Sequence, residues 1–223
     1  MLLSKAPAVL QKLRDEHSSV FHPDFNITLD ILLNSPQKLN ELEYTEAVIK
    51  ETLRLFPVGF GIKEAPTGFA ITLYSHHAKV LTRDFSATIP YNGHNYPIDN
   101  GLQVVANAHN LHYNSDYYSN PATFQPERFI DLSTSTIANN CFRTFSRGPR
   151  ACLGRNLAVD ELKVILLMTA REYEFECAGL KPNEKPKMEY TALDQVFGDI
   201  VFQELALEAK PRGGMMMRVS KRV

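Results

Sequence analysis

The sequence predicts a mainly α-helical fold with small β-sheets, an α+β class. Apolar residues recur at helical spacing in three stretches, residues 7–20, 39–56 and 157–170. Residues 58–105 are irregular and rich in strand-like alternation, interrupted by two asparagine–glycine pairs that are typical of hairpin turns. Because the helical stretches are the longer ones, helices should dominate the fold.

The composition is that of an ordinary globular protein. The chain has 223 residues, of which 44% are hydrophobic and 22% are charged, and its net charge is −1. We expect one domain over residues 1–223. The near-neutral charge gives no support for a nucleic-acid partner. No apolar run reaches the length of about 18 residues that a membrane span needs, so we expect none in these residues.

The first half of the chain carries local signals for helix boundaries. Pro7 suits the first turn of the first helix, and His17 should complete a face of that helix rather than bind a metal. Thr28 should cap a short helix that ends at residues 34–36. Pro57 should stop the second long helix, because a proline cannot continue it.

Short strands are expected wherever turn signals interrupt an alternating pattern. Residues 196–219 should form a closing β-hairpin, in addition to the strands within residues 58–105. The turn signals are the pairs Asn92 and Gly93, Asn100 and Gly101, Gly198 and Asp199, and Gly213 and Gly214.

A glycine-punctuated loop precedes the third long helix. Residues 145–158 read FSRGPRACLGRNLA, with Cys152 close to the predicted helix start and Arg150 two residues before it. Amide groups, the positive end of the helix dipole and a guanidinium all favour a thiolate over a thiol. Cys152 is therefore a candidate metal ligand or nucleophile. The alternative is a small buried hydrophobic residue, the commoner role of a lone cysteine.

The other two cysteines, Cys141 and Cys177, match no ligand pattern, and we expect them to be buried hydrophobic residues. The three cysteines include no C-x-x-C pair, and the chain has no H-x-x-x-H, so a zinc site is disfavoured. An odd, unpatterned set of cysteines indicates a reducing, intracellular compartment rather than a disulfide framework.

The loop has the spacing F-x-x-G-x-R-x-C-x-G, which resembles the haem-binding loop of the cytochrome P-450 monooxygenases. The pattern is formed by Phe145, Gly148, Arg150, Cys152 and Gly154. The resemblance implies that Cys152 is the axial thiolate of a haem b iron. It also implies that Arg150 pairs with a haem propionate and that Phe145 packs beside the sulfur.

Two further segments resemble the same family. EAVIKETLRLFP carries Glu51 and Arg54 in the family's E-x-x-R spacing, and FQPERF carries Arg128 in the segment that precedes the haem loop. The resemblance implies a buried network in which the Glu51 carboxylate accepts from both guanidinium groups. The alternative, without the haem loop, is three solvated surface charges.

Other candidate contacts with the haem propionates are less specific. Lys63 is the nearest candidate after the E-x-x-R helix for a position where the family often has an arginine, although lysine binds an anion less specifically. His109 and His112 lie near where some members hold a propionate. The alternative for both histidines is a surface or capping role. Residues 71–85 look like extra length relative to the family.

The resemblance covers almost the whole chain, and it corresponds to the C-terminal half of a fungal-type member, with AKPRGGMMMRV near the end. The distal A/G-G-x-D/E-T pattern, which carries the family's catalytic acid–alcohol pair, is absent from these residues. We therefore expect no catalytic residue in this chain, a partial or truncated haem-binding portion, and exposed apolar faces on the two later long helices.

The implied function is that of a haem-thiolate monooxygenase. Such an enzyme inserts one oxygen atom from O₂ into a small apolar substrate and takes electrons from an NADPH-dependent reductase. The tail indicates fungal secondary metabolism, and family members are tethered to the endoplasmic reticulum membrane by an anchor outside these residues. Two alternatives stay open: a haem-binding remnant without turnover, and a non-enzymatic interaction protein that uses an exposed apolar face.

Overall fold

The computed structural model describes the following parts of the chain: residues 1–58, 61–64, 87–98, 102–130, 141–178, 203–205, 209–211 and 216–222. The chain divides into two compact units, the first formed by residues 1–59 with 108–223 and the second by residues 60–107. The expectation of one domain over residues 1–223 stays a prediction. The described residues form helices and small two-stranded antiparallel sheets. This agrees with the helical spacing and the strand-like alternation of the sequence.

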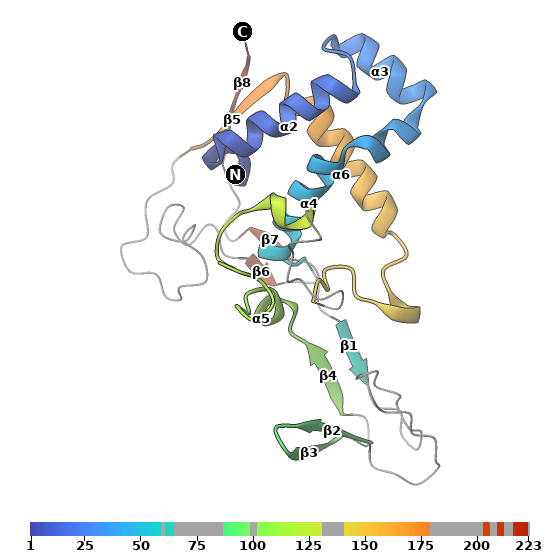
Figure 1. The fold of residues 1–223 in the computed structure, drawn as a ribbon, viewed down its shortest axis with the longest axis vertical. Coiled ribbons are helices and arrows are strands. Elements are labelled where there is room, and N and C mark those ends of the chain that lie inside the picture. Colours follow the sequence, from blue (N-terminus) through green and yellow to red (C-terminus); the bar gives the residue numbers. More distant parts are fainter. Residues whose placement is uncertain are drawn as a thin grey trace. The chain divides into compact units, whose positions relative to one another are not determined.

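Helices dominate the first unit (Figure 1). Its α-helices are α1 (Leu2–Lys5), α2 (Pro7–Val20), α3 (Phe25–Asn34), α4 (Glu43–Leu55), α5 (Ala108–His112) and α6 (Arg155–Thr169). Its 3-10 helices are Pro36–Glu41, Pro126–Phe129 and Gly148–Arg150.

The structure confirms the predicted start of α2 but not the predicted cap of α3. Pro7 is the first residue of α2, as expected, because a proline at this position loses no helical hydrogen bond. The predicted cap of α3 is wrong. Asp24, not Thr28, caps the helix, and its carboxylate accepts from the amides of Asn26 and Ile27. Thr28 is buried and donates instead to the carbonyl of His22.

The helix predicted over residues 39–56 is two elements. The 3-10 helix Pro36–Glu41 ends before Leu42, and α4 starts at Glu43. The carboxylate of Glu16, from α2, accepts the amides of Tyr44 and Thr45, with 2.8 Å from Thr45 N to Glu16 Oε2. A carboxylate at this place satisfies amides that have no partner inside a helix, so it stabilises a new helix start there.

Two apolar clusters bury the inner faces of the helices. They bring α2, the 3-10 helix Pro36–Glu41, α4 and the end of α6 together (Figure 1). One contains Phe21, Leu39, Leu42 and Leu167, and the other Leu13, Val48 and Ala170.

Helix α6 is only partly buried, although apolar residues lie on most of its faces. Leu167 is buried, whereas Leu157 and Ile165 are 69% and 55% exposed. Lys163 is also buried, although it is a charged residue. The exposed apolar residues match the open face that the sequence predicts for this helix.

Small sheets complete both units. In the first, β5 (Tyr173–Cys177) pairs with β8 (Met217–Lys221), and β6 (Gln203–Leu205) pairs with β7 (Ala209–Pro211). In the second, β1 (Gly61–Glu64) pairs with β4 (Gln103–Ala106), and β2 (Ala87–Tyr91) pairs with β3 (His94–Ile98). All four pairings are antiparallel.

The β2–β3 turn is the one that the sequence predicts. Asn92 and Gly93 both have positive φ, 48° and 76°, which is the conformation that an asparagine–glycine hairpin turn needs. The other predicted turns, at Gly101, at Gly198 and Asp199 and at Gly213 and Gly214, fall outside the described residues, and so do residues 71–85.

Candidate functional site

The loop that leads to Cys152 is closed by its own backbone. The amide of Cys152 donates to the carbonyl of Phe145 at 2.9 Å, and the amide of Ser146 donates to the carbonyl of Arg143 at 2.9 Å. Ser146 and Gly148 both have positive φ, 58° and 79°, and this reversal lets the chain turn within so few residues. The loop is therefore a defined structure rather than an extended linker.

Cys152 lies just before α6, where the sequence predicts it. Helix α6 starts at Arg155, and the amide of Arg155 donates to the carbonyl of Cys152 at 3.4 Å. Cys152 is exposed, whereas Cys141 is buried and Cys177 is intermediate. The alternative of a buried hydrophobic residue is therefore wrong for Cys152. The expected burial is confirmed for Cys141, whereas Cys177 is only partly buried.

The residues that follow Cys152 include two exposed apolar side chains. Leu153 is fully exposed, and Leu157 follows one turn later. A Cβ built on Gly154 would lie 4.0 Å from the sulfur, in ordinary van der Waals contact, so Gly154 neighbours the thiol without placing a side chain against it. Arg150, at the end of the 3-10 helix Gly148–Arg150, is exposed as well. The loop thus presents a thiol, an apolar surface and a cation to the outside.

The structure brings Glu51, Arg54 and Arg128 together in the interior of the first unit. Glu51 and Arg54 form a two-pronged pair on α4, with both N···O distances at 2.8 Å. Nε of Arg128 lies 3.1 Å from Glu51 Oε1. Glu51 and Arg54 are fully buried, so these are not solvated surface charges.

Backbone groups complete this buried cluster. The amide of Gln125 donates to Glu51 at 3.0 Å, and Arg54 donates to the carbonyls of His112 and Thr123. The Arg54 guanidinium also lies 5.1 Å from the centre of the Tyr118 ring, a cation–π distance. Charge-assisted bonds of this kind offset the cost of burying the ions. The cluster fixes α4 against the segment around the 3-10 helix Pro126–Phe129.

His112 is fully buried and joins α4 to the start of the loop. Its Nδ1 lies 3.0 Å from the carbonyl of Arg54, and its Nε2 accepts from the amide of Arg143 at 3.0 Å. Burial lowers the pKa of His112 to about 4, so the ring is neutral near pH 7. This geometry is that of a capping histidine and leaves neither nitrogen for a propionate. His109, on the same helix, stacks near Tyr113 with ring centres 4.4 Å apart.

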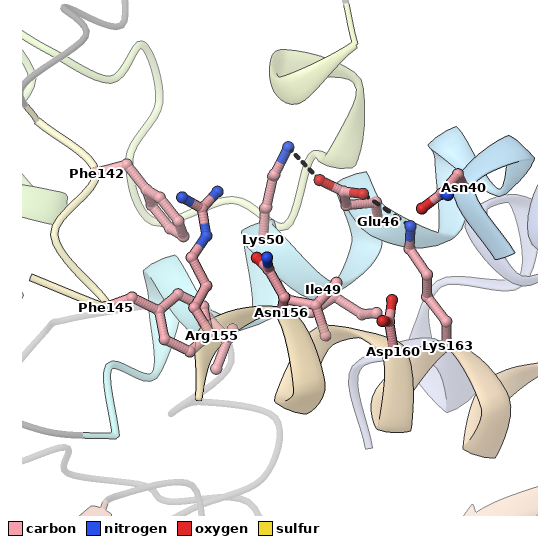
Figure 2. Close-up of a pocket in the computed structure, with 12 residues that line it drawn as sticks. Asn40, Glu46, Ile49, Lys50, Phe142, Phe145, Arg155, Asn156, Asp160 and Lys163 are labelled. Carbon is pink, nitrogen blue, oxygen red and sulfur yellow. Dashed lines mark hydrogen bonds and ion pairs between the residues drawn. The ribbon is translucent and has the colours of Figure 1, made fainter. Parts of the chain in front are cut away.

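A groove of about 260 Å³ lies between α4, α6 and the loop. Figure 2 shows Lys50 and Lys163 reaching Glu46 from two sides, with Phe142 and Phe145 at the other end of the groove. Burial alone would raise the pKa of Glu46, but hydrogen bonds and charge from Lys163 and Lys50 outweigh it and lower the pKa to about 2. At the other end of the groove, Phe145 is half-buried where the loop meets the two helices.

Sequence reasoning missed the buried polar contacts that hold these elements together. Nothing in the local pattern marks Lys163 as buried or Glu16 as the cap of α4, because both roles depend on partners far away in the chain. Lys63 falls in β1, opposite Val104, in the second unit. Its suggested contact with a propionate stays a prediction.

The described residues contain no group of three or more histidine, cysteine, aspartate or glutamate side chains that could together hold a metal ion. The same residues contain no helix that is both long enough and apolar enough to span a membrane.

The fold and the site define a class: a helix-rich protein with an exposed loop thiol before a long helix, next to a buried carboxylate–guanidinium cluster. A family profile described as Cytochrome P450 matches residues 1–68 and 73–196. Since the match covers more than half of the chain, the chain belongs to the cytochrome P450 family.

Its similar proteins include three fungal ones. It is 30% identical to the cytochrome P450 monooxygenase acrF of Aspergillus aculeatus, over 98% of this chain and 45% of that protein. It is 33% identical to ptmG of Penicillium ochrochloron, over 100% of this chain and 36% of that protein. It is also 33% identical to PC-23 of Penicillium crustosum, over 100% of this chain and 98% of that protein.

The chain therefore spans less than half of the length of acrF and ptmG, and nearly the whole length of PC-23. All three are named cytochrome P450 monooxygenases. The likeness supports a fungal-type member of the family.

Proposed function

We propose that the chain forms the haem-binding, C-terminal portion of a fungal cytochrome P450 monooxygenase. The observation that carries the proposal is the exposed Cys152 thiol, on a loop closed by the bond from Cys152 N to Phe145 O at 2.9 Å. The partial coverage of acrF and ptmG supports a chain that corresponds to part of such an enzyme.

The residues around Cys152 fit a haem b group. Haem needs only one side-chain ligand on this side, because the porphyrin supplies four nitrogens, and Cys152 is a single exposed thiol. Exposed Leu153 and Leu157 offer apolar contact for a flat macrocycle, and Gly154 places no side-chain atom against the sulfur. Arg150, and by family resemblance Lys63, would pair with the propionates.

Haem held by a thiolate supplies the activation of O₂, because the thiolate pushes electron density that favours O–O cleavage. The chain's own residues do the positioning. The closed loop holds the Cys152 sulfur in place, and Phe145 packs beside it. The buried Glu51, Arg54 and Arg128 fix α4 and thereby the base of the loop.

The overall reaction that we propose consumes O₂, two electrons and two protons. One oxygen atom enters a C–H bond of a small apolar substrate, and the other leaves as water. An NADPH-dependent reductase supplies the electrons. The catalytic acid–alcohol pair would come from residues other than these. By family resemblance, we place this reaction in fungal secondary metabolism, at the endoplasmic reticulum membrane within the cell.

A difference spectrum of the reduced, carbonyl-bound protein tests the proposal. Haem-loaded protein should give a strongly red-shifted Soret band, which reports a thiolate ligand. Cys152→Ala should abolish the band, whereas Cys177→Ala should keep it. If the wild-type protein takes up no haem, or if the band survives in Cys152→Ala, the proposal is wrong.

A second candidate function is haem binding without turnover. The exposure of Leu157 and Ile165 favours it, since nothing in the described residues covers this face of α6. Addition of a reductase with NADPH separates the two candidates, because only a complete monooxygenase would hydroxylate a substrate. A chain that binds no haem would instead support the third alternative, an interaction protein.

A further inference from the structure

His112 occupies an unusual position between the buried cluster and the thiol loop. Its side chain is fully buried. Its two ring nitrogens contact two different segments: Nδ1 lies 3.0 Å from the carbonyl of Arg54, and Nε2 lies 3.0 Å from the amide of Arg143. Arg54 ends the E-x-x-R spacing on α4, and Arg143 lies two residues before Phe145.

The contact between His112 and Arg54 runs in both directions. Nη1 of Arg54 donates to the carbonyl of His112 at 2.8 Å, while the His112 ring returns a bond to the carbonyl of Arg54. The ring is also held by aromatic neighbours. It stacks on Phe142 at 5.6 Å and meets the edge of Tyr118 at 6.1 Å. Rotating the ring would break the ring's own contacts together, whereas the bond from Arg54 Nη1 goes to the main-chain carbonyl of His112.

The partners fix the tautomer of the ring. Because the amide of Arg143 can only donate, Nε2 must carry the lone pair. The proton is then on Nδ1, which donates to the carbonyl of Arg54. A neutral ring with this tautomer joins one acceptor and one donor, and a charged ring would lose the bond to Arg143.

From Arg143 the hydrogen bonds continue to Cys152. The carbonyl of Arg143 accepts from Ser146 at 2.9 Å, and the carbonyl of Phe145 accepts from Cys152 at 2.9 Å. A second link joins the same segments, because Oγ1 of Thr144 donates to the carbonyl of Leu53 at 3.1 Å. The approach to the loop is thus tied twice to the last turn of α4.

We infer that His112 is a positioning residue for Cys152, which transmits the fixed placement of the Glu51, Arg54 and Arg128 cluster to the thiol loop. The inference rests on the proposed function only where it concerns haem. In the protein without haem it concerns the order of the loop, which is measurable by itself.

Hydrogen exchange in the haem-free chain tests the first part. His112→Asn keeps a side-chain donor near the carbonyl of Arg54 and removes the acceptor for Arg143. The matched control is Tyr113→Phe, which removes a bond of 3.2 Å to the carbonyl of Leu55 at the same end of α4 and keeps the ring. The amides of Ser146 and Cys152 should exchange on the order of tenfold faster in His112→Asn and stay unchanged in Tyr113→Phe.

The amide of buried Leu167 in α6 reports global opening in the same experiment. If the loop amides and Leu167 accelerate equally in His112→Asn, or if the two variants behave alike, the inference is wrong. The tautomer of the wild-type ring gives a test that needs no variant. Nitrogen chemical shifts should show a protonated Nδ1 and a bare Nε2 on His112, and the opposite tautomer would overturn the inference.

The spectrum of the haem-loaded protein tests the second part. In His112→Asn a smaller fraction of the carbonyl complex should show the red-shifted band, and His112→Gln, whose amide oxygen can accept from Arg143, should recover part of it. An unchanged fraction in His112→Asn would contradict the role toward haem. If no variant binds haem but the loop amides respond as expected, the proposed function fails and the positioning role stands.

Discussion

The ammonium group of Lys163 lies 2.8 Å from the carboxylate of Glu46, and the lysine side chain is only 3% exposed. Nζ of Lys163 also donates to the carbonyl of Leu39 at 3.1 Å. A single buried cation on α6 therefore contacts α4 and the 3-10 helix Pro36–Glu41. This contact sets where α6 lies, and α6 begins three residues after Cys152.

The two partners of this pair should respond differently to substitution. Glu46→Gln leaves the Lys163 ammonium buried without its counter-ion, and we expect a loss of about 3 kcal/mol in the free energy of unfolding. Lys163→Met should cost less, because Glu46 is 33% exposed and keeps its pair with Lys50. Urea unfolding measures both changes.

The exposed pair of Arg218 and Glu176 supplies the control for this prediction. Both side chains are about 70% exposed, so Glu176→Gln should leave the unfolding midpoint almost unchanged. Equal losses in Glu46→Gln and Lys163→Met would show that the burial of the ammonium group is not what makes the pair matter.

Glu51→Gln should be among the most destabilising single substitutions in the chain. It removes the charge that two buried guanidinium groups share, those of Arg54 and Arg128. We expect a loss of about 3–5 kcal/mol in the free energy of unfolding, measured with urea. A loss below about 1 kcal/mol, the range of an exposed ion pair, would mean that the cluster is solvated in solution.

The chain should lose stability as the pH falls below about 6.5, the pKa of a histidine in an unfolded chain. Burial, helped by the charge of Arg171, lowers the pKa of His17 to about 3, and burial lowers that of His112 to about 4. Both stay neutral in the folded state while the unfolded chain takes up protons. The free energy of unfolding therefore has its full value above pH 6.5. Below that pH it declines by about 1.4 kcal/mol per pH unit for each histidine.

The contribution of one histidine to this decline is measurable. His17 lies 2.8 Å from Oγ1 of Thr45, which donates its own proton to Glu16. His17→Gln can still donate to Thr45 but takes up no proton. Plots of urea midpoint against pH between 7 and 5 should be shallower for His17→Gln than for wild type. Identical slopes would mean that His17 titrates equally in the folded and unfolded states.

Gly148 is the loop residue whose backbone conformation depends on glycine. Its φ is +79°, and a Cβ at this position would meet no atom within 4 Å. Gly148→Ala should therefore cost only the backbone strain, about 1–2 kcal/mol of unfolding free energy. Ser146→Gly, at φ 58°, should be close to neutral, since relief of strain offsets the entropy of a new glycine. A neutral Gly148→Ala would indicate that the loop adopts another conformation in solution.

Local signals in the sequence predict the elements that local interactions determine. Pro7 marks the start of α2, and the pair Asn92 and Gly93 marks the β2–β3 turn. The sequence signals fail where a distant side chain decides. The break at Leu42 depends on Glu16, a residue of another helix, and hydropathy alone predicts one continuous helix there.

The site follows the same division. The spacing of Glu51 and Arg54 on one helix allows their contact to be expected from the sequence, and the glycines around Cys152 predict a tight loop. Arg128 joins the pair from a segment 77 positions away, and only the family resemblance points to it. The link through His112 has no sequence signal without the fold, because its partners are backbone groups of residues 54 and 143.

The reactivity of the three thiols gives a direct reading of the loop. Cys152 is exposed, Cys177 is partly exposed and lies 3.6 Å from the sulfur of Met217, and Cys141 is buried. A colorimetric thiol reagent added to the folded, haem-free protein should therefore show a fast phase from Cys152, a slower one from Cys177, and the third thiol only after denaturation.

Cys152→Ser should remove the fast phase and leave the other two, while Cys177→Ser should remove only the slower one. Haem added before the reagent should suppress the fast phase, because a sulfur bound to iron is no longer free to react. Hydrophobic compounds of similar size that contain no metal should not protect the Cys152 thiol from the reagent. If Cys152 reacts at the same rate with and without haem while the protein takes up haem, iron is bound elsewhere and the exposed thiol is not its ligand.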